Sequence, residues 1–258
     1  MKYIDEKCKV LKNDIIAKET FDMQIFAPKI AQIAKAGQFV NIMCGDKILR
    51  RPISICEING DNVRLVYQTK GEGTIWLSKI KQDDEISVFG PLGKGFIHAM
   101  QKKFKEIPQN IVLIGGGIGA PPMLETLKQT GGDVILGFRS KDNVILQSDF
   151  KKYCANVQIA TDDGSAFTHG FVTDILKENL EKIAYDAILA CGPRPMLRAI
   201  FEIAQQKSIP CFVSMEERMG CGIGACLVCA CKVKMPEYEG YAHVCKSGPV
   251  FNAEHIVW

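Results

Sequence analysis

The period with which hydrophobic and polar residues alternate changes along the chain. In the first part of the chain it is the period of β-strands. Up to about residue 98, short apolar runs alternate with turns, as in GQFVNIMC, RPISICEI and NVRLVYQT. The stretch NGDN (59–62) between the last two runs is a strong hairpin signal. A short helix is expected after Gly73, over TIWLSKI, before EISVFGPLGKGF returns as a strand. Many short strands with one helix predict a small β-barrel over residues 1–98.

The second part alternates strands with helices. The apolar runs IVLI (111–114), DVILGF (133–138), NVQIAT (156–161) and AYDAILAC (184–191) are typical of buried strands. The stretches PPMLETLKQ, FVTDILKENLEKI and PMLRAIFEIAQQK are expected to form helices. This order predicts a parallel, doubly wound sheet, and so a Rossmann-like domain over 99–212. Residues 213–258 are expected to form a third, cysteine-rich unit. The fold class is therefore multidomain, β plus α/β.

Composition adds one unusual feature, which is cysteine. The chain has 258 residues, 47% hydrophobic and 24% charged, as in ordinary soluble proteins. A net charge of +3 without any basic run does not favour nucleic acid binding. The start, MKYIDEKCKV, lacks a signal-peptide core, and the apolar run near 111–124 is broken by Gly and Pro. We therefore expect no membrane span and a cytoplasmic location. Eleven cysteines in a reducing compartment indicate metal ligands or redox groups.

Four of the cysteines have the spacing of an iron–sulfur site. Cys221-x4-Cys226-x2-Cys229 is followed after fifteen residues by Cys245. This is the plant-type ferredoxin pattern for a [2Fe–2S] cluster. The intervening residues are small, which lets a loop turn its backbone N–H groups toward sulfur. Structural zinc is the alternative, but zinc ribbons usually have two C-x2-C knuckles, and only one is present here.

The other cysteines, and the one nearby histidine, are not expected to be cluster ligands. Cys231 lies two residues after the third candidate ligand and is expected to pack beside the cluster. His243 is not expected to bind iron, because Rieske centres use two histidines on one iron. Five further cysteines lie in apolar or strand-like settings and are expected to be buried filler, namely Cys8, Cys44, Cys56, Cys154 and Cys211.

A glycine-rich turn follows the first strand of the second part. GGGIGA (115–120) matches G-x-G-x-x-A between a strand and a helix, a pattern that places backbone N–H groups against a diphosphate. An ordinary tight turn is the alternative. The acidic residue expected about twenty positions on is absent, and FRSK (138–141) stands there, so the choice between NADH and NADPH stays open. The stretches at 162–165 and 191–196 follow strands at the same predicted sheet edge.

Two polar segments of the predicted barrel are also candidates for anion binding. Arg51 offers a fork of donors suited to phosphate, and the hydroxyl of Ser54 can bond a ring nitrogen. Gly73 and Thr74 open the short predicted helix. For the arginine, simple solvation is the alternative interpretation.

Together these segments resemble a known family. RRPIS, GEGT, GPLGKGF, LIGGGIGAPPML and CGPRPML, in this order, are similar to the ferredoxin–NADP⁺ reductase superfamily. Its members hold FAD on a β-barrel and the nicotinamide on a Rossmann-like domain. Within this superfamily, the segments MGCGIGACLVCACKV and HVCKSGPVF indicate a narrower family. The whole chain closely resembles the electron-transfer subunits of type B dihydroorotate dehydrogenases.

The resemblance implies three cofactors, FAD, a [2Fe–2S] cluster and NAD(H), with a role for each matching segment. Ser247 departs from the family pattern, in which an acidic residue is more usual, while the four thiols are intact. The implied FAD residues are Arg51, Pro52, Ile53, Ser54, Val66, Tyr67, Gln68, Gly73 and Thr74. Those on the nicotinamide side are Gly115, Gly117, Gly119, Cys191 and Gly192, and the cluster ligands are Cys221, Cys226, Cys229 and Cys245.

The resemblance also implies a function. Electrons would pass between NAD(H), FAD and the cluster, and then to or from an FMN-containing catalytic subunit that oxidises dihydroorotate in pyrimidine (UMP) biosynthesis. The implied assembly is a heterotetramer with two copies of each subunit. The alternatives are the small FAD/[2Fe–2S] subunit of an NADH-dependent ferredoxin:NADP⁺ oxidoreductase, sulfide dehydrogenase or hydrogenase, and a zinc-stabilised binding module.

Overall fold

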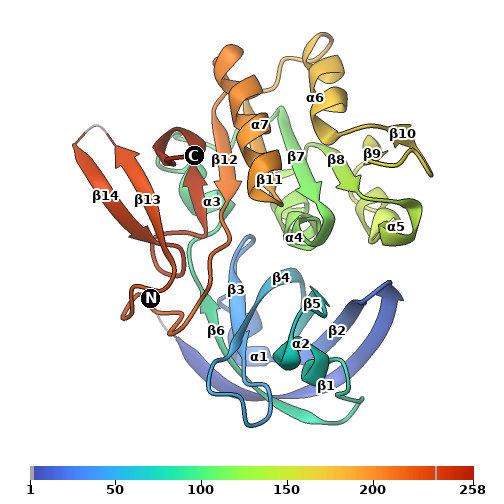
Figure 1. Ribbon diagram of the computed structural model, residues 1–258, viewed down its shortest axis with the longest axis vertical. Helices are drawn as coiled ribbons and strands as arrows, with labels where there is room; N and C mark the ends of the chain where they lie inside the picture. Colours follow the sequence, from blue (N-terminus) through green and yellow to red (C-terminus); the bar gives the residue numbers. More distant parts are fainter. Residues whose placement is uncertain (1–2, 236) are drawn as a thin grey trace.

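The N-terminal part of the chain is a closed six-stranded antiparallel barrel (Figure 1). The computed structural model describes residues 3–235 and 237–258. The barrel interior is filled by inward-facing aliphatic residues at alternate strand positions. Around the barrel the strands are β1 (Ile4–Ala17), β2 (Thr20–Phe26), β5 (Asn62–Gln68), β4 (Arg51–Asn59), β3 (Phe39–Ile42) and β6 (Glu85–Leu92), with helices α1 (Pro28–Ala31) and α2 (Glu72–Leu77) in its connections.

The second part is a seven-stranded sheet that follows helix α3 (Phe96–Met100). Its order places β7 between β8 and β11, so the chain reverses direction across the sheet beside β7. In such sheets, ligands bind at the carboxyl ends of the strands at this switch point. The strands in order are β10 (Thr168–His169), β9 (Val157–Thr161), β8 (Asp133–Phe138), β7 (Ile111–Gly116), β11 (Ala187–Cys191), β12 (Cys211–Ser214) and β15 (Val250–Asn252).

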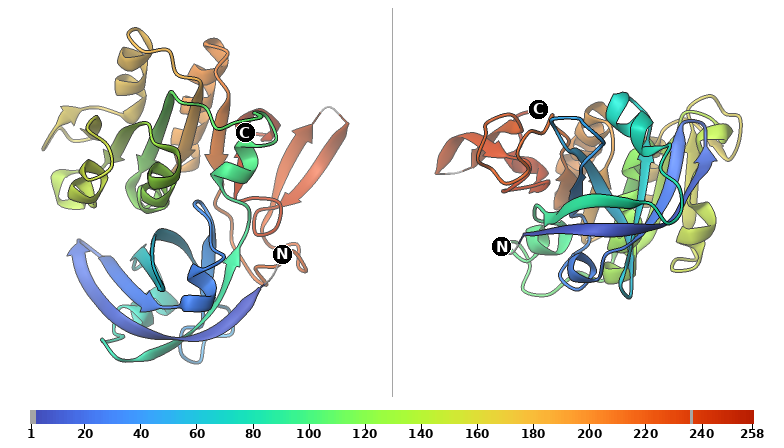
Figure 2. Two further views of the ribbon diagram at one scale, coloured as in Figure 1. Left: turned by 180° about the vertical axis from the view of Figure 1, so that it is seen from behind. Right: turned by 90° about the horizontal axis from the view of Figure 1, so that it is seen from below.

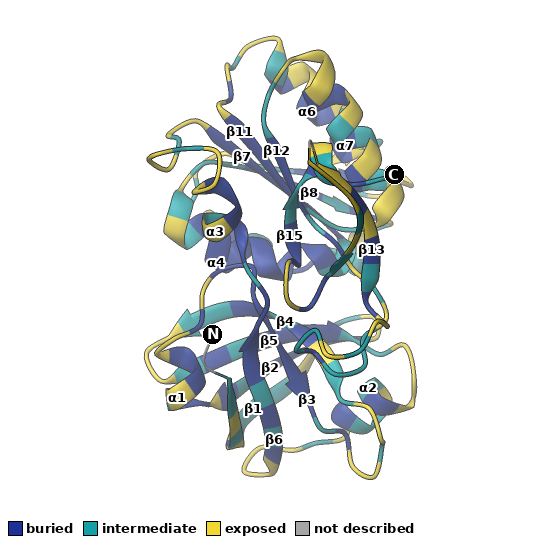
Figure 3. Ribbon diagram, turned by 90° about the vertical axis from the view of Figure 1, so that its left-hand side faces the viewer, coloured by how far each residue is buried: buried dark blue, intermediate teal, exposed yellow. Residues whose placement is uncertain are grey.

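Helices cover both faces of this sheet, as the strand–helix alternation predicts. Val112 and Ile114 of β7 share a core with the helices of one face, while Ile111 and Leu113 share a core with those of the other. The first face carries α6 (Val172–Leu180) and α7 (Arg194–Gln206), and the second carries α4 (Pro121–Thr130) and α5 (Gln147–Lys151). Figure 3 shows α4 deeply buried between the sheet and the barrel.

The C-terminal segment packs against both other parts. β13 (Ala230–Met235) and β14 (Tyr238–His243) form a hairpin that projects from the body (Figure 1). The last strand, β15, joins the large sheet antiparallel to β12. The back view in Figure 2 shows the same arrangement of hairpin and sheet edge. The cysteine-rich segment is therefore continuous with the edge of the Rossmann-like sheet.

The predicted fold class is confirmed, and most predicted elements are present. Asn59 and Asn62 pair across the expected hairpin, and α2 begins beside Gly73. The pattern did not reveal the short elements α1, α3, α5 and β10, or the addition of β15 to the sheet, because such short segments have too little periodicity. Within residues 3–235 and 237–258, no helix has the length and hydrophobicity needed to cross a membrane.

Candidate electron-transfer site

The first candidate FAD segment lies at the start of β4, where strand alternation sorts its side chains. Ile53 points into the barrel core and is 8% exposed, so its side chain is not available to a ligand. Pro52 and Ser54 lie on the opposite face and are accessible. Arg51 is the first residue of β4, and its guanidinium donates to the carbonyl of Leu49.

The same arginine joins the first and third candidate segments. A Cβ built on Gly73 would come within 2.4 Å of Arg51 Nε, so only a glycine lets the guanidinium lie against α2. Thr74 Oγ1 caps this helix by accepting from the N–H of Gly71 and of Lys70. Arg51 thus brings a fixed, delocalised cation to the surface where α2 begins, as a diphosphate site requires.

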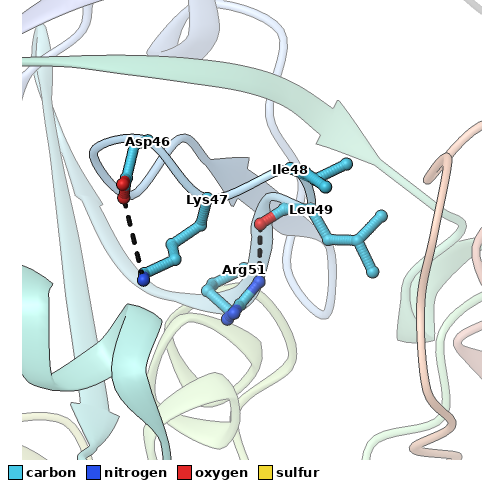
Figure 4. Close-up of a pocket in the computed structure, with 5 residues that line it drawn as sticks. All are labelled: Asp46, Lys47, Ile48, Leu49 and Arg51. Carbon is cyan, nitrogen blue, oxygen red and sulfur yellow. Dashed lines mark hydrogen bonds and ion pairs between the residues drawn. The ribbon is translucent and has the colours of Figure 1, made fainter.

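An open pocket lies beside this arginine (Figure 4). It is lined by Arg51 and by the β3–β4 loop, residues 46–49. Lys47 pairs with Glu72 of α2 at 2.9 Å, and this hydrogen bond raises the pKa of the ammonium group. A Cβ on Gly45 would meet the Trp76 ring at 2.9 Å, so the loop is packed closely on α2. The pocket therefore has two basic side chains, Arg51 at the start of β4 and Lys47 on a loop that contacts α2.

The second candidate segment is mostly buried. Tyr67 is 2% exposed, stacks on Phe21 with ring centroids 5.7 Å apart, and donates its hydroxyl to Asn13 at 3.0 Å. Val66 is also buried, in the core shared with α4. Only Gln68 of this segment has an accessible side chain. Any contact from Val66 or Tyr67 to a ligand would therefore use the backbone.

The candidate nicotinamide loops meet at the sheet's switch point. A Cβ on Gly119 would lie 2.3 Å from the carbonyl oxygen of Cys191, and one on Gly115 would lie 2.7 Å from Ala120 Cα. Gly117 has a φ of +52° and no atom within 4 Å of its Cβ position, which leaves its backbone open. Gly192 also packs tightly, against Gly116. The turn has the close packing and the open backbone that a diphosphate needs.

Other groups border the same edge. Burial raises the pKa of Cys191 to about 12, although a hydrogen bond with Ser214 opposes this, so the thiol is neutral at pH 7. The loop at 162–165 is tied to the end of β8, since the N–H of Lys141 donates to Ser165 Oγ at 2.8 Å.

The four spaced cysteines come together in two pairs. Cys229 and Cys245 have their sulfurs 3.2 Å apart and are buried. Cys221 and Cys226 form the other pair, in which the N–H of Cys221 approaches the sulfur of Cys226 at 3.5 Å. The N–H of Gly224 links the pairs by donating to Cys245 Sγ at 3.1 Å.

Backbone donors also surround the first sulfur. Cys221 Sγ accepts from the N–H groups of Ile223, Ala225 and Cys226 at 3.3–3.4 Å. Burial alone would raise the pKa of Cys221, but these donors lower it to about 6. Thiolates held by several N–H groups are what an iron–sulfur cluster requires.

The pairing also bears on the kind of metal. In a [2Fe–2S] centre each iron takes two thiolates, and the two thiol pairs fit this division.

The neighbouring residues lie largely as expected. Cys231 is buried in the core, and burial raises its pKa to about 11. Ser247 is exposed, and its N–H donates to the carbonyl of His243 at 2.8 Å. Lys246 lays its stem over Gly224, where a Cβ would come within 2.5 Å. The fillers Cys8, Cys44, Cys56 and Cys211 are buried, whereas Cys154 is half-exposed.

One contact between the barrel and the cysteine loop was not predicted. Asn41 of β3 pairs with Pro52 of the first candidate FAD segment and is 1% exposed. A Cβ on Gly222 would lie 2.4 Å from its Nδ2, so the amide touches the cysteine loop. Its Oδ1 has no partner among the described residues and is free to accept a bond from a bound group. The only sequence signal was a polar residue within the apolar run FVNI.

The fold and site define a class of protein: a flavin reductase fold of the ferredoxin–NADP⁺ reductase type that carries an iron–sulfur segment. A family model described as the iron–sulfur cluster binding domain of dihydroorotate dehydrogenase B matches residues 216–257. The NADH-dependent reduced ferredoxin-NADP oxidoreductase structure superposes with a TM-score of 0.84 and 29% identity, over 97% of this chain and 90% of that one. A ferredoxin NADP⁺ reductase from Neisseria gonorrhoeae shares the fold, with a TM-score of 0.65 and 18% identity, over 80% of this chain and 92% of that one.

Curated relatives specify the family. The dihydroorotate dehydrogenase B (NAD(+)) electron transfer subunit of Fusobacterium nucleatum is 41% identical, over 97% of this chain and 98% of that protein. The subunit of the same name from Geobacillus sp. is 39% identical over 98% of both chains. The chain belongs to the family of dihydroorotate dehydrogenase B electron transfer subunits.

Proposed function

We propose that this chain relays electrons between NAD(H) and the catalytic subunit of a dihydroorotate dehydrogenase B, through FAD and a [2Fe–2S] cluster. The observation that carries the proposal is the arrangement of the two thiol pairs, whose loop touches the barrel at Asn41, the residue paired with Pro52. Bound FAD supplies a hydride acceptor that releases its electrons singly, and a bound cluster carries one electron at a time. The protein's own contribution is to fix the three sites close together.

Each site has residues suited to its group. Arg51 neutralises a diphosphate at the start of α2, and Ser54 offers a hydroxyl on the accessible face of β4. Gly117 leaves its backbone open for the nicotinamide coenzyme. The four thiols hold iron, and the loop N–H groups stabilise their negative charge. No side chain has to move a proton for this relay.

The partner is expected to dock beside the cysteine loop. Leu227 and Val228, between the second and third ligands, are 77% and 55% exposed. Exposed apolar side chains flanking a redox centre suit a protein interface that brings a second centre near. We place an FMN-containing catalytic subunit at this surface, in a heterotetramer with two copies of each chain. A cytoplasmic location fits the eleven free thiols.

Purification of the chain with its native partner tests this function. We expect an FMN protein to co-purify, and the complex to reduce NAD⁺ when supplied with dihydroorotate. A complex that contains the partner but shows no dihydroorotate-dependent reduction of NAD⁺ would refute the proposal.

A second candidate is supported by the 29% identity to the NADH-dependent reduced ferredoxin-NADP oxidoreductase structure. The same three sites would then serve a different large subunit. Co-purification with a larger FAD-containing, multi-cluster protein, in place of an FMN protein, would favour this candidate.

A further inference from the structure

A group of buried charged side chains lies where helix α4 packs on strand β4, away from the thiols and the coenzyme loops. Lys128 of α4 reaches across this contact. Its Nζ lies 3.2 Å from Glu57 Oε1, 3.1 Å from the carbonyl oxygen of Ile58, and 3.3 Å from Glu125 Oε2. Glu125 in turn accepts from the N–H of Ile58 at 2.9 Å. Three of these four bonds join the Rossmann-like part to the barrel.

Arg64 of β5 extends the group. Its guanidinium bonds Asp22 at 2.9 and 3.0 Å, Glu57 at 3.3 Å, and Asp149 of α5 at 3.1 Å. Burial would lower the pKa of Arg64, but its hydrogen bonds to Asp22 and Asp149 raise it. The guanidinium is thus a second charged link between the barrel and the Rossmann-like part.

These side chains are too well buried to be ordinary surface pairs. The exposed fractions are 3% for Asp22, 7% for Glu125, 13% for Arg64 and 17% for Glu57. Buried ion pairs add little net stability, because desolvation offsets their attraction. They do penalise any geometry in which a partner is lost, so they favour one relative position of the elements that carry them.

The two elements joined here also carry two of the cofactor sites. β4 begins with the candidate FAD segment and carries Glu57 and Ile58 near its other end, just past a bulge. Helix α4 begins directly after the glycine turn at 115–120 and carries Glu125 and Lys128 on its next turns. A shift of α4 along β4 therefore moves the glycine turn relative to Arg51 and Ser54.

We propose that Lys128, with Glu57 and Glu125, is a positioning group for hydride transfer: it fixes the register of α4 on β4 and so the distance between nicotinamide and flavin. This inference rests on the proposed function. Hydride transfer moves two electrons and one proton from NADH to the ring that accepts them, and leaves NAD⁺. Such a transfer is sensitive to misplacement of about 1 Å.

The test uses the holo complex with its partner subunit and the variant Lys128→Met. Flavin bleaching is followed anaerobically after mixing with NADH. Reduction of the cluster is followed separately after mixing with dihydroorotate, whose electrons enter from the partner. We expect Lys128→Met to lower the limiting NADH-driven rate about 10- to 100-fold. The dihydroorotate-driven rate should stay within about twofold. Lys128→Arg, which keeps the charge, should restore most of the loss. Lys9→Met removes an exposed pair within the barrel (2.7 Å to Asp83) and should change neither rate.

Hydrogen exchange gives a readout that does not depend on activity. The Ile58 amide donates to Glu125, so its exchange should speed up in Lys128→Met and not in Lys9→Met. An NADH-driven rate within about twofold of wild type would overturn the proposal, as would an equal loss of both rates. If Lys128→Met does not fold, Glu57→Gln takes its place, and the same two rates decide the outcome. A wild-type complex whose flavin is not reduced by NADH and whose cluster is not reduced by dihydroorotate would instead refute the proposed function.

Discussion

The barrel and the cysteine loop contain the same kinds of residue in opposite environments. In the barrel, Cys8 and Cys56 are fully buried among aliphatic side chains, and burial raises the pKa of Cys8 to about 12. In the loop, Cys221 and Cys226 are half-exposed and face backbone N–H groups, while Leu227 is exposed. Backbone donors thus distinguish Cys221 and Cys226 from the filler thiols. The other two candidate ligands, Cys229 and Cys245, are as buried as the fillers and are indicated by their spacing.

The largest expected effect comes from removing one loop thiol. Cys226→Ser should abolish the cluster, because one iron would lose a thiolate, and electron exchange with the partner should stop. FAD should remain bound, since the barrel carries its own site. The visible spectrum and iron content of the purified variant measure this. Cys231→Ser is the matched control and should keep the cluster. Joint loss of FAD and cluster in Cys226→Ser would mean that the two sites are not separate.

The next largest effect is expected on FAD binding at the barrel. Arg51→Ala should weaken FAD binding about 10- to 100-fold, because a charge-assisted contact to phosphate is lost. Equilibrium dialysis of FAD measures this, and the cluster content should not change. Arg50→Ala is the control, since Arg50 is engaged with Asp5 and Ser87. Equal FAD losses in both variants would contradict the assignment of Arg51.

A smaller effect is expected at the exposed face of the loop. Leu227→Asp should weaken association with the catalytic subunit about tenfold, because a charge replaces an apolar contact. Titration calorimetry with the purified partner measures this. The cluster spectrum should be retained, and Ile15→Asp, at an exposed barrel residue, should have no effect. Unchanged affinity in Leu227→Asp would place the partner elsewhere.

The smallest effect concerns a filler thiol. Cys56→Ala should lower the free energy of unfolding by about 1 kcal/mol, because a small buried group is removed from the core shared by the barrel and α4. Denaturant unfolding of the variant measures this, with FAD and iron content as controls. Loss of either cofactor would break the distinction between filler and ligand cysteines.

The sequence predicted those features that depend on local spacing. The strand–turn–helix at 115–120 and the four-cysteine pattern each lie in or near one short segment, so residue types and intervals were enough. Contacts between distant segments were not predictable in this way. Lys128 meets Glu57 only because α4 packs on β4, and Asn41 meets Gly222 only because the cysteine loop folds back on the barrel. Neither pair leaves a periodic or spacing signal.

Some residues of the segments that resemble FAD-binding segments are buried, so the resemblance alone could not assign their side chains a role. Ile53 and Tyr67 lie within matched segments, yet their side chains face the barrel core. Strand alternation could have separated Ile53 from Pro52 and Ser54, since alternate residues face opposite sides. For Tyr67 the hydroxyl partner, Asn13, lies 54 residues away, and no local pattern indicates it.

We expect one chain to hold a flavin and a two-iron cluster together. The most direct test is the content of FAD, iron and acid-labile sulfide per chain, measured on protein purified with its native partner. About one FAD, two iron and two sulfide per chain are expected, as a bound flavin and a [2Fe–2S] centre require. A chain that contains zinc, with neither flavin nor sulfide, would contradict this expectation.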